Sequence, residues 1–265
     1  MSRNEHLTYL FDDTALADLK RFINRTTLFA FDLDGTLAPI VSNTGAIGIP
    51  DAILAEFAIL NTRATVAVIT GRFRADALLH LGITPRYLIG NHGAEGLPGW
   101  ETREDEFVRT TKEWQHQLDV LLPIDDRDGI VIENKGATLS IHYRHASHRE
   151  VAHALILRAV NRLVPHPRRV GGKCIESLIP DGAPDKGVAL MHLMHQAGCP
   201  KGFFIGDDET DEDVFRLDHE NLFTVRVEKR TGSRARYYLR QQHEITRLLR
   251  DINRILGTTE GSATR

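Results

Sequence analysis

The sequence predicts an α/β fold, a doubly wound parallel sheet with a smaller α+β unit inserted into it. Five short apolar runs recur along the chain with helix-like stretches between them, and strands that alternate with helices indicate a parallel sheet covered on both faces. Three of these runs end in polar clusters, at the place where open α/β sheets bind ligands. The pattern changes between residues 98 and 180, which indicates the inserted unit.

The main sheet is predicted from apolar runs that have the length of buried strands. The five runs are residues 28–33, 65–70, 86–91, 203–207 and 222–227. A helix is expected before the second run, because Ile53, Phe57 and Leu60 share one helical face. The polar clusters follow the first, second and fourth runs, at residues 32–36, 70–72 and 207–211.

The inserted unit is predicted to contain strands as well as helices. The strands are residues 130–134, 137–143 and 173–179, and the helices lie near residues 109–122 and 148–163. Clusters of glycine and proline at residues 93–99 and 180–184 are the expected hinges. We therefore expect a discontinuous core of residues 1–97 and 181–265 and an insert of residues 98–180.

Composition excludes several classes of function. With 265 residues, 42% of them hydrophobic and 26% charged, the chain can bury the cores of one large or two modest domains. The net charge of −3 gives no basic surface for nucleic acid, so small ligands are favoured, and the basic stretch at residues 226–240 is interpreted as a solvated face. Cys174 and Cys199 lack CxxC spacing and predict neither a disulfide framework nor a zinc site.

The chain carries no signal for a membrane. It has neither an apolar leader at its N-terminus nor a run of roughly 18 apolar residues, so we expect no membrane segment and a cytoplasmic location. Its two cysteines suit a reducing compartment. Nothing resembles a heptad repeat, which favours a monomer. Residues 1–25 precede the first predicted strand and suggest no function.

Two carboxylates stand at the end of the first predicted strand. Asp32 and Asp34 flank Leu33, and carboxylates this close repel one another unless a cation relieves the repulsion. Mg²⁺ prefers oxygen ligands and keeps several waters, so one or two carboxylates and a substrate phosphate suffice to hold it. Asp207, after the fourth strand, is the natural third contributor. The sequence therefore predicts a magnesium site at this edge of the sheet.

The same residues suit phosphoryl transfer. A carboxylate nucleophile, here Asp32, forms an acyl phosphate and divides one difficult displacement into two easier ones. Asp34 protonates the leaving oxygen in the first step and then, as a carboxylate, activates water in the second. Thr70 and Lys186 are the candidates to stabilise charge on the phosphoryl group in the transition state.

Each of these features also has a purely structural interpretation. Asp-x-Asp-Gly alone is commonly a turn or a helix entrance. The acidic residues 207–213 alone can be a helix N-terminus that suits the helix dipole. Their joint occurrence after predicted strands, in one order, favours a site. The histidines clustered at residues 142–153, and those at residues 192–195, show no zinc pattern and are interpreted as surface or core residues.

The motifs resemble those of the haloacid dehalogenase superfamily. They are Phe-Asp-Leu-Asp-Gly-Thr-Leu at residues 31–37, Thr70, Lys186 and Gly-Asp-Asp-Glu-Thr-Asp-Glu at residues 206–212. The resemblance implies a doubly wound catalytic core with Asp32 as the nucleophile. It also implies Mg²⁺ held by Asp32, the Asp34 carbonyl and Asp207, with Asp208 and Asp211 beside these ligands as their support.

More narrowly, the chain resembles the trehalose-6-phosphate phosphatase family from residue 28 to residue 250 or so. The added motifs are Thr-Leu-Ala-Pro-Ile at residues 36–40, Thr-Gly-Arg at 70–72, His-Gly-Ala-Glu at 92–95, Glu-Asn-Lys-Gly at 133–136 and His-Tyr-Arg at 142–144. The resemblance implies Mg²⁺-dependent hydrolysis of trehalose 6-phosphate, in trehalose biosynthesis. It makes residues 98–180 a cap that recognises the sugar.

The resemblance also implies which residues bind the substrate. Glu133, Lys135 and Glu176 in the cap would hydrogen-bond the sugar hydroxyls, because charged groups make strong hydrogen bonds to them. Without the resemblance, the favoured interpretation is that Glu133 and Lys135 merely pair at the surface of one strand. The other implied substrate contacts are Gly71, Arg72, His142 and Arg144.

The segment that follows Glu176 departs from the family pattern, and this departure leaves other functions open. After its glutamate the family usually has an apolar residue, a basic residue and proline, whereas Glu176 is followed by Ser-Leu-Ile-Pro. This departure favours, as an alternative, a phosphatase of another sugar phosphate with the same mechanism. A sugar-phosphate-binding regulator without turnover is the third interpretation. The presence of all the core residues argues against it, namely Asp32, Asp34, Thr70, Lys186 and Asp207.

Overall fold

The computed structural model describes residues 7–40, 48–123, 127–172 and 174–258. The chain divides into two compact units, which we call the core unit, residues 1–93 with 185–265, and the insert unit, residues 94–184. Lys173, the first residue of a predicted strand, lies outside the described residues. None of the helices within the described ranges combines the length and the apolar character that crossing a membrane requires.

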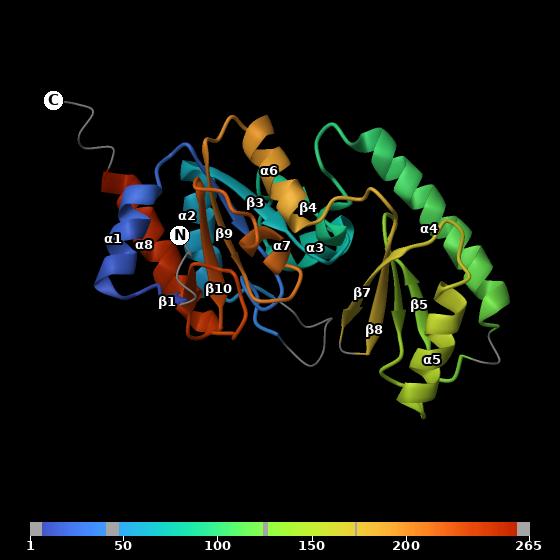
Figure 1. Ribbon diagram of the computed structural model, residues 1–265. Helices are drawn as coiled ribbons and strands as arrows, with labels where there is room; N and C mark the ends of the chain where they lie inside the picture. Colours follow the sequence, from blue (N-terminus) through green and yellow to red (C-terminus); the bar gives the residue numbers. More distant parts are fainter. Residues whose placement is uncertain (1–6, 41–47, 124–126, 173, 259–265) are drawn as a thin grey trace. The chain divides into compact units, whose positions relative to one another are not determined.

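An all-parallel sheet of seven strands forms the centre of the core unit (Figure 1). The strand order is β1-β11-β10-β9-β2-β3-β4. All five predicted strands are present, and the short strands β1 and β11 extend the sheet beyond β10. The strands are β1 Thr8–Tyr9, β2 Thr27–Phe31, β3 Thr65–Ile69, β4 Tyr87–Ile89, β9 Lys201–Gly206, β10 Leu222–Val227 and β11 Tyr237–Leu239. The predicted α/β fold is therefore confirmed.

Helices cover both faces of this sheet. In Figure 1, α2 and α8 lie side by side on one face, and α6 and α7 lie on the other. The helices are α1 Asp13–Phe22, α2 Asp51–Arg63, α3 Arg74–Leu81, α6 Lys186–Gln196, α7 Glu212–Phe215 and α8 Ile245–Thr258, with short 3-10 turns at Asn91–Gly93 and Gln242–Glu244. Because both faces are covered, the central strands are buried along their whole length, which is why β2 reads as a continuous apolar run.

The core of this unit lies where aromatic side chains of neighbouring strands meet α2 and α8. Phe31 of β2 meets Phe57 of α2 edge to face, with ring centroids 5.3 Å apart, and its ring centroid lies 6.1 Å from that of Phe203 in β9. All three side chains are fully buried, as are Leu248 and Ile252 of α8. Burial of these large apolar side chains holds β2 and β9 together at the centre of the sheet.

The segment before the first predicted strand closes one edge of the sheet. Residues Thr8 and Tyr9 of β1 pair with β11 in parallel, and the Tyr237 hydroxyl donates to Asp18 of α1 over 2.9 Å. An unpaired edge strand is open to association with other chains, so this short strand and its helix protect β11. For the described part of residues 1–25 the structure thus indicates a structural role.

The insert unit is an antiparallel four-stranded sheet with two helices. The elements are β5 Val131–Asn134, β6 Leu139–His142, β7 Arg168–Gly172, β8 Ile175–Ile179, α4 Glu101–Leu121 and α5 Arg149–Val160, and the strand order is β5-β6-β8-β7. The sequence analysis missed β7, since Arg-Arg-Val-Gly-Gly is neither apolar nor alternating. It also placed the start of α4 too late, because the first turns of α4 are almost entirely polar.

Both helices pack on one face of the insert sheet (Figure 1). Trp114 of α4 and Ile156 of α5 are fully buried against Leu139 and Ile141 of β6 and Leu178 of β8. The Trp114 indole N–H donates to the carbonyl of Pro165 over 2.7 Å. This hydrogen bond satisfies the one polar atom of the buried side chain. The buried indole of Trp114 and its hydrogen bond therefore help to hold α4 against this sheet.

Replacing Trp114 by alanine should lower the free energy of unfolding by about 3–5 kcal/mol, because a large cavity forms and a buried hydrogen bond is lost. Urea denaturation followed by circular dichroism measures the change. The matched control is Val120→Ala on the same helix, where the side chain is 79% exposed and little should change. Equal midpoints for the two variants would contradict the assigned core.

Candidate active site

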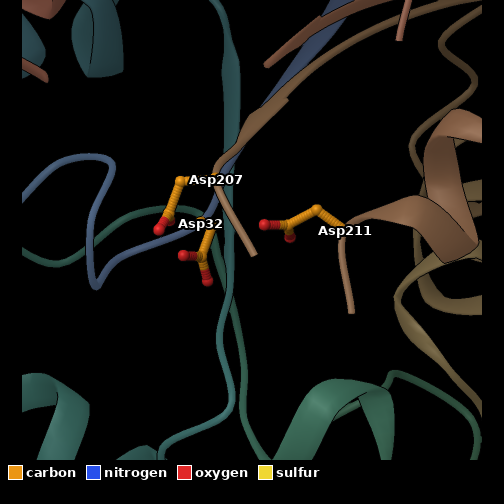
Figure 2. Close-up of side chains that lie close together, drawn as sticks. All are labelled: Asp32, Asp207 and Asp211. Atoms are coloured by element: carbon orange, nitrogen blue, oxygen red, sulfur yellow. The ribbon is translucent and has the colours of Figure 1, made fainter. Parts of the chain in front are cut away.

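Three carboxyl groups meet at the carboxyl edge of the core sheet. Asp32 follows β2, Asp207 follows the neighbouring strand β9, and Asp211 stands at the start of α7. Figure 2 shows their carboxyl groups close together, and one oxygen of each lies within 4.8 Å of the others. Within the part of the chain that the structure describes, no other group of carboxylates, histidines and cysteines is arranged to hold a metal ion.

A single ammonium group is buried among these carboxyls. Lys186 Nζ donates to Asp32 Oδ1 over 2.8 Å and to Asp211 Oδ1 over 2.7 Å. Lys186 is the first residue of α6, and Asp185 caps that helix by accepting from the backbone N–H of Val188. The cap fixes the direction in which α6 begins, so the lysine points into the carboxyl cluster.

The cluster carries more negative charge than its lysine balances. Burial, together with the negative charge of the neighbouring Asp211, raises the pKa of Asp207 to about 7. Burial likewise raises the pKa of Asp32 well above its usual range, although Lys186 opposes this shift. Although burial lowers the pKa of Lys186, Asp211 and Asp32 raise it above the ordinary value, so this group stays charged. A hard divalent cation such as Mg²⁺, which takes carboxylate oxygens, fits this surplus of buried charge.

Asp211 supports the cluster. Its Oδ1 accepts from Lys186, and its Oδ2 accepts from the backbone N–H of Asp208 over 2.8 Å. The side chain is fully buried and packs on Gly206, where an added Cβ would lie 2.2 Å from the Asp211 carboxyl carbon. With both oxygens engaged, Asp211 orients Lys186 and the loop after β9. Asp208 takes part through its backbone, and its side chain is exposed.

Asp207 lies against the loop that follows Asp34. The Thr36 hydroxyl donates to Asp207 Oδ1 over 3.2 Å. Gly35 has a positive φ of 82°, and an added Cβ there would lie 2.2 Å from Asp207 Oδ2. Glycine is therefore required at this position both by the backbone conformation and by the close approach of the carboxylate.

Asp34 is held by an arginine that the sequence analysis assigned to the substrate. Arg72 Nε and Nη2 donate to the two carboxylate oxygens of Asp34 over 2.7 and 2.8 Å. Its remaining nitrogen, Nη1, donates to Asp76 over 2.6 Å. The fork geometry orients the Asp34 carboxylate. Arg72 thus forms hydrogen bonds with two carboxylates of its own unit. One of them, Asp76, is a site residue that the sequence analysis missed.

Thr70 and Gly71 shape the end of β3. Thr70 is fully buried, its backbone N–H donates to the carbonyl of Ile89 over 2.9 Å, and its hydroxyl accepts from the Arg72 N–H over 3.2 Å. An added Cβ at Gly71 would lie 2.4 Å from the imidazole of His92. Gly71 therefore allows a close approach of His92, and its role in substrate binding stays a prediction.

Within the insert unit, three of the predicted sugar-binding residues lie together. Glu133 of β5 and His142 of β6 are joined by a 2.8 Å contact between Glu133 Oε2 and His142 Nε2. Lys135 Nζ lies 3.7 Å from the same oxygen. The hydrogen bond with His142 lowers the pKa of Glu133, although burial opposes the shift. Arg144, beyond the end of β6, is exposed, and its carbonyl accepts from Arg149.

Glu176 does not join that group. It pairs with Ile141, whose side chain is buried under the helices, and its own Oε1 lies 2.8 Å from His153 Nε2 of α5. Side chains on one strand alternate between faces, so Ser177 instead shares the face of Glu133, through the row Glu133, Ser140 and Ser177. The structure therefore separates Glu176 from Glu133 and Lys135.

The basic stretch at residues 226–240 is not a uniformly solvated face, and the sequence analysis was wrong about Arg226. This arginine belongs to β10, an interior strand, and is 4% exposed. It pairs with Glu212, which is equally buried. The signal was present in the sequence, because an arginine inside an apolar parallel strand needs a buried partner.

The fold and the site together define a class. A doubly wound parallel sheet with an acidic cluster at its carboxyl edge and an inserted α+β unit is the haloacid dehalogenase-like arrangement. A solved trehalose-6-phosphate phosphatase related protein matches 88% of this chain and 100% of its own, with a TM-score of 0.68 at 21% identity. The trehalose-6-phosphate phosphatase of Aspergillus fumigatus matches 93% and 99%, with a TM-score of 0.64 at 24% identity. These likenesses show the fold.

Sequence comparisons narrow the class to a family. The family profile described as trehalose-phosphatase matches residues 30–242. The trehalose-6-phosphate phosphatase of Escherichia coli is 32% identical over 71% of this chain and 71% of its own length. The trehalose-phosphate phosphatase of Mycobacterium bovis is 31% identical over 70% of this chain and 49% of its own length, so the matched region spans about half of the mycobacterial relatives. The chain belongs to the trehalose-phosphatase family.

Replacing Gly35 by alanine should displace the Asp207 carboxylate, since the new Cβ takes the place of Asp207 Oδ2, and should remove the rise in unfolding temperature that we expect MgCl₂ to give the wild-type protein. Gly136→Ala is the matched control, because φ is +80° there and nothing lies within 4 Å of an added Cβ. Both variants should lose roughly 1–2 kcal/mol to the left-handed backbone. Thermal unfolding with and without MgCl₂ separates them, and an undiminished response in Gly35→Ala would contradict the close packing.

Proposed function

We propose that this chain hydrolyses trehalose 6-phosphate to trehalose and inorganic phosphate, with Mg²⁺ and through an aspartyl phosphate on Asp32. One observation carries the proposal. Asp32 is a buried carboxylate fixed by Lys186 at the edge where β2 and β9 end, with Asp207 beside it, in a chain of the trehalose-phosphatase family. A carboxylate held in this way is placed to act as a nucleophile rather than as a surface charge.

The metal would be held by the carboxyl cluster, whose negative charge Lys186 balances only in part. Asp32 and Asp207 offer carboxylate oxygens, and the backbone carbonyl of Asp34 is the expected third protein ligand. Bound Mg²⁺ supplies positive charge that neutralises the phosphoryl oxygens. Asp211 stays on Lys186 and on the Asp208 N–H, so it holds the shape of the site.

In the first half-reaction, Asp32 attacks phosphorus and the bond between phosphorus and the sugar oxygen breaks. Lys186, which donates to Asp32 Oδ1, supplies a fixed positive charge beside the transferred group. Asp34 gives a proton to the sugar oxygen as it leaves. Arg72 orients Asp34 through both of its carboxylate oxygens, and its contact with Asp76 fixes the arginine in turn.

In the second half-reaction, Asp34 acts as a general base instead of a general acid. Having given up its proton, it is the carboxylate that takes a proton from water while the water oxygen attacks the phosphorus of the aspartyl phosphate. The bond between phosphorus and the Asp32 oxygen breaks, and inorganic phosphate leaves with the carboxylate of Asp32 restored. The fork of Arg72 suits this step, since its two hydrogen bonds hold the Asp34 carboxylate in one orientation.

A second candidate function is hydrolysis of another sugar phosphate by the same chemistry. It is favoured by the placement of Glu176, which lies under α5 with His153 and away from Glu133 and Lys135. A sugar would then meet Ser177 on the face of Glu133, and a serine hydroxyl makes weaker hydrogen bonds than a carboxylate. The chemistry of the core unit is the same under both candidates.

The test is a substrate panel with phosphate release as the readout, in MgCl₂ and in excess EDTA. We expect trehalose 6-phosphate to give the highest kcat/KM, above sucrose 6-phosphate and glucose 6-phosphate, and EDTA to abolish release. Asp32→Asn is the control, because an amide is a poor nucleophile and the variant should fold yet release no phosphate.

Other outcomes of the panel are equally informative. A higher kcat/KM for another sugar phosphate would overturn the substrate and leave the mechanism standing. Activity retained by Asp32→Asn would overturn the nucleophile. Binding of trehalose 6-phosphate without turnover under any divalent metal would support a regulator in place of an enzyme.

Asp34→Asn should lower turnover of trehalose 6-phosphate by about 10²- to 10⁴-fold, the usual contribution of a general acid and base. With p-nitrophenyl phosphate, whose leaving group needs no proton, the variant should still release a first equivalent of nitrophenolate quickly. Steady-state release should then be slow, because hydrolysis of the aspartyl phosphate lacks its base. Rapid-quench and stopped-flow measurements resolve the two phases.

The control for this experiment is Asp13→Asn, which removes an exposed carboxylate from the first turn of α1 and should leave both phases at the wild-type rates. Loss of the nitrophenolate burst in Asp34→Asn would show that Asp34 acts on the nucleophile or the fold and is not the proton donor to the leaving group.

A further inference from the structure

Arg226 is a buried charge whose place in the mechanism is still unassigned. It is the fifth residue of β10, which pairs with β9 on one side and with β11 on the other. Its register partner in β9 is Gly206, the residue before Asp207. Only 5% of its side chain is exposed. Burying a guanidinium group is unfavourable unless it is paired and hydrogen-bonded, so its partners indicate its role.

Arg226 donates to the loop that carries Asp207 and to the first residue of α7. Nη2 donates to the backbone carbonyl of Asp207, and Nη1 donates to the carbonyl of Asp208 over 3.1 Å. Nη1 also donates to Glu212 Oε1 over 3.0 Å. Glu212 is itself fixed, since its Oε2 accepts from the backbone N–H of Arg234 over 2.9 Å. One guanidinium group therefore joins two consecutive carbonyls of the loop to a buried carboxylate.

The same loop is fixed from its other side by Asp211, whose Oδ2 accepts from the Asp208 N–H. The peptide group between Asp207 and Asp208 is thus held at its carbonyl by Arg226 and at its N–H by Asp211. Two hydrogen bonds hinder rotation of this planar peptide group, which restricts the backbone at Asp207 and with it the direction of the bond from Cα to Cβ. That direction sets where the carboxylate of Asp207 lies.

We propose that Arg226, anchored by Glu212, is a positioning residue that directs the Asp207 carboxylate into the Mg²⁺ site. The inference rests on the proposed function, which makes Asp207 a metal ligand. Mg²⁺ demands nearly ideal octahedral geometry, so a small displacement of one ligand weakens binding. The planar guanidinium fork reaches both carbonyls and the carboxylate together, whereas a lysine ammonium at this position is a single point donor.

The decisive variant is Arg226→Lys, which keeps the positive charge beside Glu212 and removes the fork. We expect the folded variant to bind Mg²⁺ about 10- to 100-fold more weakly, the usual effect of losing a group that orients a metal ligand. The rise in unfolding temperature with MgCl₂ concentration gives the dissociation constant without reference to activity. In the phosphatase assay, the MgCl₂ concentration for half-maximal rate should rise by the same factor, with kcat restored at saturating MgCl₂.

Arg236→Lys is the matched control. Arg236 lies just before β11, and its Nη2 donates to the carbonyl of His219 over 3.2 Å, away from the Asp207 loop. This variant should bind Mg²⁺ with wild-type affinity. The comparison separates the loss of any arginine-to-carbonyl bond from the loss of the bonds to the Asp207 loop.

A folded Arg226→Lys variant with wild-type affinity for Mg²⁺ would overturn the inference and leave the proposed function intact. Should this variant not fold, Glu212→Gln is measured in the same way, because Arg226 then keeps its carbonyl partners and loses its anchoring charge. Wild-type affinity in that variant overturns the inference, and weaker binding supports it. A wild-type protein that MgCl₂ does not stabilise, and that releases no phosphate, would instead overturn the proposed function.

Discussion

A surplus of buried negative charge governs the core unit. Asp32, Asp207 and Asp211 converge where β2 and β9 end, and Lys186 lies among them as a counter-charge. Carboxylates this close are unfavourable together, and each of them is fixed by a hydrogen bond from Lys186, Thr36 or the Asp208 backbone. The parallel sheet makes this possible, because the carboxyl ends of adjacent strands necessarily lie side by side. Gly35 lies so close to Asp207 that no side chain fits there.

Two arginines near the site form hydrogen bonds with the segments that carry the acidic residues. Arg72 holds both oxygens of Asp34, and Arg226 holds the carbonyls of the Asp207 loop. Each is anchored by a further carboxylate, Asp76 for the first and Glu212 for the second. Arginine suits this work because its donors lie in one rigid plane and it keeps its charge when buried. The acidic residues are thereby oriented before any ligand arrives.

In the proposed function, chemistry and sugar recognition belong to different units of the chain. The five core positions from Asp32 to Asp207 lie in the core unit, where strand ends gather them. The proposed sugar contacts lie on the insert sheet, where the alternation of side chains puts Glu133 and Ser177 on one face and Glu176 on the other. The substrate therefore depends on the register of a small antiparallel sheet, which shifts a residue to the opposite face with each single step.

From the sequence alone follow the α/β fold, the five central strands, the acidic residues after them and the family, because apolar periodicity and motif spacing are local properties of the chain. The edge strands, β7 and the contacts of Arg72, Arg226 and Glu176 do not follow from it. These depend on which strands become neighbours and on which face of a strand a residue lies, and both are set by pairing between distant segments. Arg226 shows the difference, since its sequence neighbours suggest a basic surface and its strand neighbours bury it beside Glu212.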